Sequence, residues 1–122
     1  MEPTKKELQK KSKLEMMLYY HLVATRGGKN RMYILKILMT RPMNINQIAR
    51  KIGITYSGVL YHIKILEKNN LIIPFGEKYG TIYALSEQIE QNINLVNDLD
   101  QKVSPVSLSS VINEMLDQNV KN

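Results

Sequence analysis

Apolar residues recur at helical spacing on either side of a single glycine, Gly53, in the middle of the chain. The segment before it carries one apolar stripe, formed by Ile45, Ile48, Ala49 and Ile52. The segment after it carries a second stripe, formed by Val59, Ile63 and Leu66. Because glycine tolerates the left-handed backbone that ends many helices, Gly53 predicts a short, tight turn. We therefore expect two short helices that cross with their apolar stripes facing each other.

Polar residues mark the starts of both helices and cover the outer face of the second. Asn44 is a favoured N-cap residue for the first helix, and Thr55 or Ser57 can cap the second. The outer face of the second helix is expected to hold Tyr56, Ser57, Leu60, Tyr61 and Lys64. This set of hydroxyl groups, aromatic edges and one cation does not indicate an enzyme site.

Two more helices are predicted before this pair. A capping-box pattern precedes a helix expected over residues 4–26, whose apolar side is formed by Leu8, Leu14, Met17, Leu18, His21 and Leu22. Gly27 and Gly28 then break this helix. A supporting helix is expected over residues 29–40, and Pro42 stops it.

Two β-type runs follow the helices, at residues 71–75 and 81–85, with a turn-rich stretch at 76–80 between them. Pro74 cannot donate a ladder hydrogen bond, so the first strand is expected at a sheet edge or with a bend. The two runs predict a small β-hairpin, here called the wing. Together with the preceding helices it forms a core over residues 29–85.

Beyond the wing, Ser86 can cap a helix with near-heptad apolar spacing, and Pro105 restarts the chain into a further amphipathic helix, so helices are expected over residues 87–120. One chain of this size offers little core to cover both. A symmetric dimer would bury the excess, and the alternative is that these helices fold back on their own domain. The residues expected at a dimer interface are Leu14, Leu18, His21, Leu22, Ile93, Val96, Leu99, Val103, Val111 and Met115.

Charge is distributed unevenly along the 122 residues. The chain has 17 Lys and Arg against 11 Asp and Glu, for a formal net charge of +6. Residues 1–85 are basic, whereas residues 86–122 are acidic. Such asymmetry suits a body that attracts polyanions and a tail that need not touch them, although mildly basic soluble proteins of other classes are common.

The chain contains no cysteine, which excludes disulfides and thiolate metal sites and fits a reducing interior. The apolar stretch at residues 16–24 is far shorter than the roughly 20 residues that span a bilayer. No small-residue cleavage site follows it, so we interpret it as part of an amphipathic helix and not as a signal peptide.

Several of these features together resemble the ArsR-type winged helix-turn-helix regulators. They are the small residue Ala49, the turn at Gly53, the inward Val59, the motif running from Tyr61 to Leu66 and the closing pair Leu71-Ile72. The resemblance covers about residues 29–85. It implies a mainly α fold with a small β-hairpin wing and with N- and C-terminal dimerisation helices, in one domain over residues 1–122.

Metal sensing is not implied by the resemblance. The metal-sensing members of the group use sites rich in cysteine or in His and Asp, and this chain has only two histidines. His62 lies at the histidine position of the motif, where a core or backbone-facing role is expected. His21 is expected to be an interface histidine and is the candidate for pH sensitivity. No metal or cofactor is therefore expected, and a small-molecule effector is left open.

The resemblance implies binding of double-stranded DNA, with the helix over 55–69 in the major groove and the wing over 72–85 on the backbone or minor groove. Candidates for base contacts are Thr55, Tyr56, Ser57, Leu60, Tyr61 and Lys64. Candidates for phosphate or wing contacts are Asn44, Arg50, Lys51, Lys68, Lys78 and Tyr79. Tyrosines at helical spacing also pack in cores, and surface cations are often only solvated. Leu60 either touches a thymine methyl or indicates that the helix is rotated.

We therefore predict a homodimeric transcription regulator that recognises a palindromic operator, with repression as the default mechanism and a cytoplasmic, nucleoid-associated location. The alternatives are a protein-interaction module that uses Tyr56, Leu60 and Tyr61 as an adhesive surface, and a nonspecific architectural DNA-binding protein. An enzyme is not expected, because the sequence lacks a paired-carboxylate motif, a nucleophile with a nearby base, metal-ligand spacing and a phosphate loop.

Overall fold

The computed structural model describes residues 2–76 and 80–103 and leaves the side chain of Val103 undescribed. The predictions for Lys78, Tyr79, Val111 and Met115, and for the last helix, lie outside the described residues. Helices and strands follow in the order α1 (Lys5–Tyr19), η1 (Tyr20–Ala24), α2 (Gly28–Thr40), β1 (Met43–Asn44), α3 (Ile45–Ile52), α4 (Tyr56–Lys68), β2 (Ile72–Phe75), β3 (Ile82–Leu85), α5 (Glu87–Glu90) and α6 (Ile93–Val103). The predicted class, a mainly helical winged helix-turn-helix with a small wing, is confirmed.

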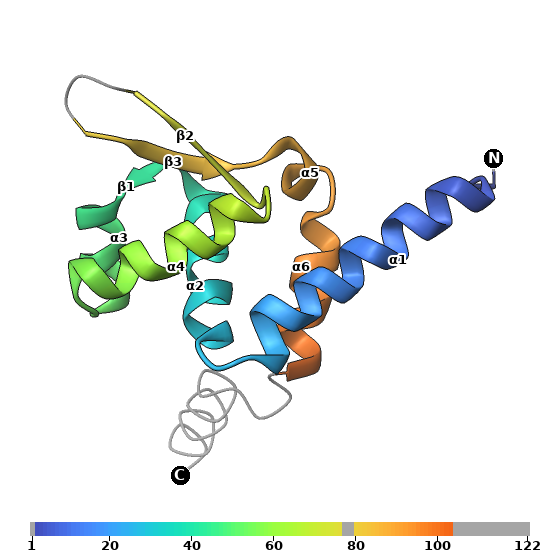
Figure 1. The fold of residues 1–122 in the computed structure, drawn as a ribbon, viewed down its shortest axis with the longest axis horizontal. Coiled ribbons are helices and arrows are strands. Elements are labelled where there is room, and N and C mark those ends of the chain that lie inside the picture. Colours follow the sequence, from blue (N-terminus) through green and yellow to red (C-terminus); the bar gives the residue numbers. More distant parts are fainter. Residues whose placement is uncertain (1, 77–79, 104–122) are drawn as a thin grey trace, which may run out of the picture.

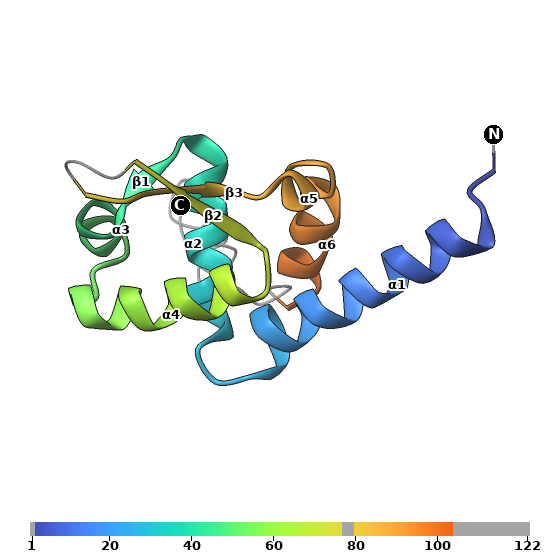
Figure 2. The same cartoon turned by 45° about the horizontal axis from the view of Figure 1, so that its top comes forward.

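The helices surround α2, which lies at the centre of the body (Figure 1). Helices α3 and α4 lie on one side of α2 and α6 lies on the other, while the sheet runs across one end. Helix α1 packs beside α6 and then extends beyond the body at its N-terminal half, as the tilted view also shows (Figure 2). The largest fully buried side chains of the core include Leu18, Ile34, Ile48, Ile63 and Leu71.

The N-terminal helix begins as predicted but ends differently. The Thr4 hydroxyl accepts a hydrogen bond from the Glu7 amide at 3.2 Å, which caps α1. The predicted single helix to residue 26 is corrected, because the last turn, η1, is a π-helix that ends at Ala24. There the Thr25 amide donates to the Tyr20 carbonyl, five residues back, at 3.2 Å.

Gly28 does not break the chain as predicted but is the first residue of α2. It is buried against the preceding helix, and a Cβ atom there would lie 2.7 Å from the Leu22 carbonyl carbon. Gly28 therefore permits close approach of η1 and α2. Of the two adjacent glycines, it is Gly27 that adopts left-handed backbone, with φ of 90°.

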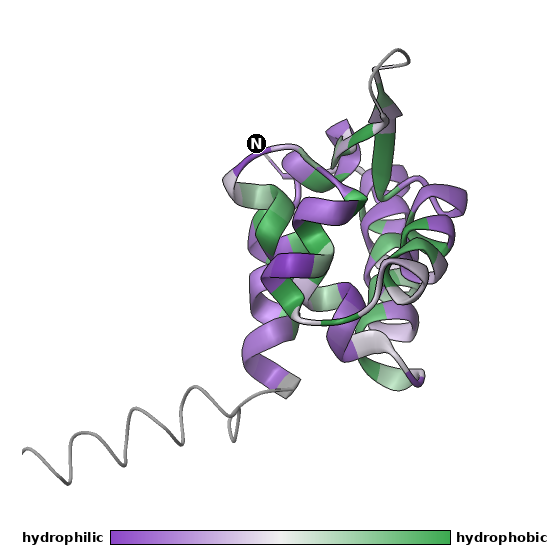
Figure 3. Ribbon diagram, turned by 90° about the vertical axis from the view of Figure 1, so that its left-hand side faces the viewer, coloured by the Kyte–Doolittle hydropathy of each residue, from purple (hydrophilic) through white to green (hydrophobic). Residues whose placement is uncertain are grey.

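The sheet has three strands in the order β1-β3-β2, all antiparallel. Pro74 lies in β2, an edge strand, as predicted. Strand β1 was not predicted; it pairs Met43 with Tyr83 and leads directly into α3. The wing strands are largely hydrophobic and project from the helical body, as Figure 3 shows, and Ile73, Phe75 and Ile82 are exposed on them.

The expected long helix after Ser86 is divided into α5 and α6. Ser86 caps α5 by accepting from the Ile89 amide at 3.3 Å. At the division, the Asn92 side chain donates to the Gln88 carbonyl at 2.8 Å, and the Asn92 carbonyl accepts from the amide of Leu95. The Asn92 side chain therefore satisfies a backbone carbonyl at the break.

Candidate nucleic-acid interface

Three sets of hydrogen bonds cap the ends of the helices in the helix-turn-helix. The Asn44 side chain accepts from the Gln47 amide at 2.8 Å, and the Gln47 side chain accepts from the Asn44 amide at 2.9 Å. Gly53 ends α3 with φ of 79°, and its amide donates to the Ala49 carbonyl at 2.8 Å. The Thr55 hydroxyl caps α4 by accepting from the Gly58 amide at 3.1 Å. The predicted turn and caps are confirmed.

Helix α4 has an exposed stripe of polar, aromatic and basic side chains opposite a buried apolar stripe. The exposed stripe, here called the reading stripe, follows the spacing i, i+4, i+7 and i+11 and consists of Ser57, Tyr61, Lys64 and Lys68. The buried stripe consists of Val59, Ile63 and Leu66, each with no exposed surface. Since the apolar stripe already supplies the packing, the reading stripe is available to a partner along the whole helix.

Two base-contact candidates have a structural role in addition to any contact. The Thr55 hydroxyl is used by the helix cap and lies 3.4 Å from the Ser57 hydroxyl. Leu60 is partly buried and packs against the core. Its placement on the outer face is therefore corrected, because it lies at the border between the reading stripe and the buried side of α4.

A hollow of about 500 Å³ opens between α3 and the start of α4. Its lining consists of Asn46, Ala49, Arg50, Ile54 and Tyr56. It joins Tyr56, from the base-contact set, to Arg50, from the phosphate set. Asn46 was missed by the sequence analysis, although its spacing of four residues from Arg50 places both on one side of α3.

The candidates for phosphate contact fall into two groups, exposed cations and one residue whose side chain is already hydrogen-bonded. Arg50, Lys51 and Lys68 are exposed around the helix-turn-helix. Asn44, in contrast, is half-buried and its side-chain oxygen is engaged in the cap of α3. Arg50 and Lys51 thus add exposed cations on α3 to the two lysines of the reading stripe, Lys64 and Lys68.

The terminal helices contribute to the core of their own chain. Of the residues predicted at a dimer interface, Leu14, Leu18, Leu22, Val96 and Leu99 belong to the intrachain core, while His21 and Ile93 are half-buried. Helix α6 is also tied to α2 by an ion pair between Lys36 and Asp100. The assignment of these residues to a dimer interface stays a prediction.

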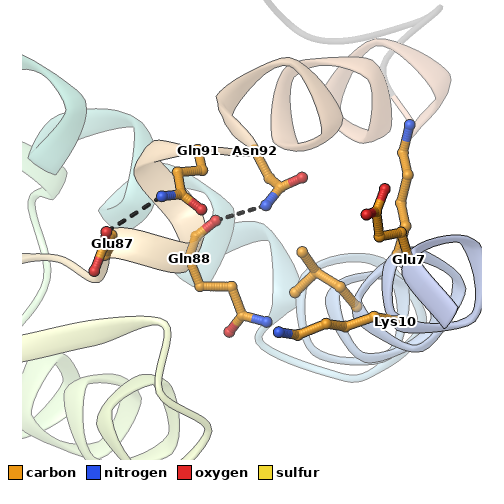
Figure 4. Close-up of a pocket in the computed structure, with 8 residues that line it drawn as sticks. Glu7, Lys10, Glu87, Gln88, Gln91 and Asn92 are labelled. Atoms are coloured by element: carbon orange, nitrogen blue, oxygen red, sulfur yellow. Dashed lines mark hydrogen bonds between the residues drawn. The ribbon is translucent and has the colours of Figure 1, made fainter. Parts of the chain in front are cut away.

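A second hollow, also about 500 Å³, lies between α1 and α5. Its lining is Glu7, Lys10, Lys11, Leu14, Glu87, Gln88, Gln91 and Asn92. Figure 4 shows the Gln91 side chain turned toward Glu87, to which it donates a hydrogen bond at 3.2 Å.

His21 lies in η1 and His62 lies in α4. Neither belongs to a metal cluster within the described residues. His62 is buried on α4, as predicted for its position. Burial and the nearby Arg31 cation lower the pKa of His62. The same two causes lower the pKa of His21, opposed by a hydrogen bond with Asn69. In residues 2–76 and 80–103 no helix has the length and apolar character needed to cross a membrane.

The fold and the helix-turn-helix define a winged helix-turn-helix protein of the kind found in transcription regulators. Residues 28–73 match the family described as bacterial regulatory protein, arsR family. This segment is therefore similar to the ArsR family over the helix-turn-helix, in line with the sequence resemblance. No curated protein gives a significant match to the chain.

Several solved structures are similar to this chain in fold. HlyU from Vibrio cholerae has a TM-score of 0.58 at 19% identity, over 73% of this chain and 95% of its own. The transcriptional regulator BldR from Sulfolobus solfataricus has a TM-score of 0.58 at 15% identity, over 99% of both chains. Mb0332 from Mycobacterium bovis, described as a homodimeric winged helix-turn-helix DNA-binding domain and a possible ArsR-family regulator, has a TM-score of 0.58 at 16% identity, over 83% of this chain and 91% of its own.

Proposed function

We propose that the protein is a sequence-specific transcription regulator, a repressor, that binds double-stranded DNA as a homodimer. The observation that carries this proposal is the reading stripe of α4, which stays exposed while the opposite stripe is fully buried. In the proposed complex α4 lies in the major groove, and Ser57, Tyr61 and Lys64 face base edges. The set of neighbours described as transcription regulators supports the same class.

Phosphate contacts supply most of the affinity in this proposal. Arg50 and Lys51 are exposed on α3, and Lys68 is the last member of the reading stripe on α4. Cations of this kind displace counterions from DNA, so binding weakens steeply with salt. The wing strands β2 and β3, on which Ile73, Phe75 and Ile82 are exposed, would lie on the backbone or minor groove beside α4.

The dimer contacts are proposed to come from the outer side of α1 and η1, since the apolar inner side is occupied within the chain. Large apolar side chains are exposed there: Leu8, Met16, Tyr19 and Tyr20. Met16 alone exposes 71% of its surface. A two-fold pair of chains would present two α4 helices to successive major grooves about 34 Å apart, over a palindromic site.

Fluorescence anisotropy tests the proposal. Purified protein is titrated onto its own upstream DNA and onto a shuffled duplex of equal composition, at several salt concentrations. We expect saturable, salt-steep binding with a preference of about a hundredfold or more for the native site. Equal binding to both duplexes would contradict sequence specificity and favour an architectural role. No binding at low salt would overturn the proposal in favour of a protein-interaction module.

Repression is tested separately with a reporter gene behind the same upstream DNA. Expression of the protein is expected to lower the reporter signal, and a variant that has lost specific binding is expected to restore it. A rise in the signal on expression would identify an activator instead.

A further inference from the structure

Arg31 is a buried cation held by neutral groups. Only 2% of its surface is exposed, and within the described residues its guanidinium makes no ion pair. Instead Nε donates to the His21 carbonyl at 2.8 Å, and Nη2 donates to the Thr25 hydroxyl at 2.7 Å and to the Arg26 carbonyl at 3.3 Å. A buried charge is costly unless it is hydrogen-bonded, so these acceptors hold Arg31 in one position.

The π-helical turn provides one of these acceptors. Because the Thr25 amide bonds to Tyr20, one residue further back than in an α-helix, the His21 carbonyl accepts from Arg31. Turns of this type are frequent at functional sites. The end of the N-terminal helix is thereby fixed to the guanidinium of α2.

The fourth partner of Arg31 lies on α4. Nη1 is 3.1 Å from Nδ1 of His62. A guanidinium has only donors, so Nδ1 must be the acceptor and His62 must be neutral, with its proton on Nε2. The ring is also confined from the turn, where a Cβ atom on Gly27 would lie 2.8 Å from His62 Cε1.

His62 in turn contacts the reading stripe. Its ring meets the ring of Tyr61 edge to face, with centroids 5.3 Å apart. Tyr61 exposes 61% of its surface, whereas His62 exposes 7%. One continuous path of contacts therefore runs from the end of the N-terminal helix through Arg31 and His62 to an exposed residue of the reading stripe.

The groups around His62 determine what a proton would do there. From α2 the ring faces the Arg31 cation, from α4 it faces the Tyr61 ring, and from the turn it faces the Gly27 backbone. His21 and Tyr20 of η1 lie beyond Arg31. A proton on Nδ1 would remove the acceptor and place a second cation against Arg31.

We propose that Arg31 and His62 are positioning residues for Tyr61, and that protonation of His62 releases this contact and weakens sequence-specific DNA binding. The inference rests on the proposed function. Arg31 positions the ring of His62, and His62 positions Tyr61 on the reading stripe. Because the N-terminal helix end is fixed to the same guanidinium, the device also links the proposed dimer face to the DNA-facing helix.

The direction in which specific DNA affinity changes at low pH distinguishes this positioning contact from a purely electrostatic effect of the added proton. Burial and Arg31 lower the pKa of His62 below its usual value of 6.5, so the ring takes up a proton only as the pH falls below that value. An added positive charge by itself strengthens binding to DNA. Disruption of the Arg31 contact instead weakens specific binding, so the two accounts predict opposite trends.

The test compares His62→Asn with His21→Asn between pH 7.5 and pH 5.5 at constant salt. Asn keeps an acceptor near the position of Nδ1 but takes up no proton. We expect the specific affinity of the natural chain and of His21→Asn to fall several-fold as the pH approaches 5.5, up to at most about tenfold for each pKa unit between the free and bound states. His62→Asn should change less than about twofold over the same range. An affinity that rises at low pH, or a His62→Asn profile equal to that of the natural chain, would overturn the proposal.

Arg31→Lys provides a second variant, because an ammonium cannot make the same set of forked contacts. It should lose preference for the native duplex at pH 7.5 while it keeps its nonspecific affinity. An unchanged preference would contradict a positioning role for Arg31.

NMR of the DNA-free protein keeps the two proposals distinguishable. As His62 titrates, the Tyr61 ring resonances and the α4 amides should shift with the same midpoint, whether or not any duplex is bound. If they shift but no DNA binds at any pH, the proposed function fails and the positioning contact remains. If they do not shift, the positioning contact fails regardless of DNA binding.

Discussion

The side chains of Asn44 and Gln47 each accept a hydrogen bond from the other residue's backbone amide, at 2.8 and 2.9 Å. This reciprocal pair satisfies two amides at the start of α3 that would otherwise lack partners. Asn44 is also the last residue of β1, so the pair fixes the point at which the sheet becomes the helix-turn-helix. A residue predicted to contact phosphate has a structural role here.

Asn44→Ala is expected to lower the free energy of unfolding by about 1 kcal/mol through loss of the cap. Urea unfolding followed by circular dichroism measures the change. Asn46→Ala, in the first turn of α3 and exposed, is the matched control and should change stability by less than about half as much. Equal losses in the two variants would argue against the cap as the source of stability.

Tyr61→Ala should relax sequence preference more than it weakens binding to random DNA. A good base contact is worth about 1 to 3 kcal/mol of discrimination, and Tyr61 is on the reading stripe. Anisotropy with the native and shuffled duplexes gives both affinities. Tyr33→Ala serves as control, because this tyrosine is exposed on α2. If Tyr61→Ala lowers both affinities equally, Tyr61 is not a base reader.

Lys68→Gln should weaken binding to every duplex and reduce the slope of log affinity against log salt by about 0.9 for each phosphate that is no longer neutralised. The reason is that a neutral side chain releases no counterion. Lys5→Gln, an exposed lysine at the start of α1, removes the same charge far along the chain from the helix-turn-helix. A slope that changes by the same amount in both variants would indicate an effect of net charge alone.

Met16→Glu should convert a dimer to monomer, because it places a charge on the proposed apolar face of α1. Sedimentation velocity over a range of protein concentrations measures the mass. Ile73→Glu is a suitable control, since Ile73 is exposed on β2, outside the proposed interface. A dimer that persists in Met16→Glu would remove α1 from the interface, and a natural chain that is monomeric at all concentrations would contradict the proposed dimer.

Gly27→Ala should destabilise the protein more than Gly53→Ala. Both glycines have left-handed backbone, which costs an alanine about 1 to 2 kcal/mol. At Gly53 a Cβ atom meets nothing within 4 Å, whereas at Gly27 it meets His62 Cε1 at 2.8 Å. Urea unfolding of both variants isolates the extra cost of that contact. Equal costs would mean that the His62 ring moves aside freely.

The helix-turn-helix could be predicted from the sequence because its signals are local. Gly53 and Thr55 each act on the backbone within a few residues, and the spacing of Val59, Ile63 and Leu66 identifies the buried side of α4. Once the buried side of α4 was identified, the exposed residues on its opposite side could be predicted as the DNA-facing side. Leu60 was misplaced because its angular position lies at the border between the two sides.

Other features depend on contacts between distant residues and gave no local signal. Strand β1 has two residues, too few for an alternating pattern, and exists because Met43 and Asn44 pair with β3. Arg31 follows a lysine and an asparagine on a helix and looks solvated, yet it is buried by η1 and α4. The break at Asn92 was hidden because apolar residues continue on both sides of it.

Because β1 continues directly into α3, the wing and the helix-turn-helix form one rigid unit. Strand β3 pairs with β1 on one side and with β2 on the other, and no linker separates β1 from α3. In the proposed complex the spacing between the wing contact and the α4 contact is therefore fixed by the protein and does not adapt to the DNA. An operator with one base pair inserted between the two contacts would have to bend or lose one of them.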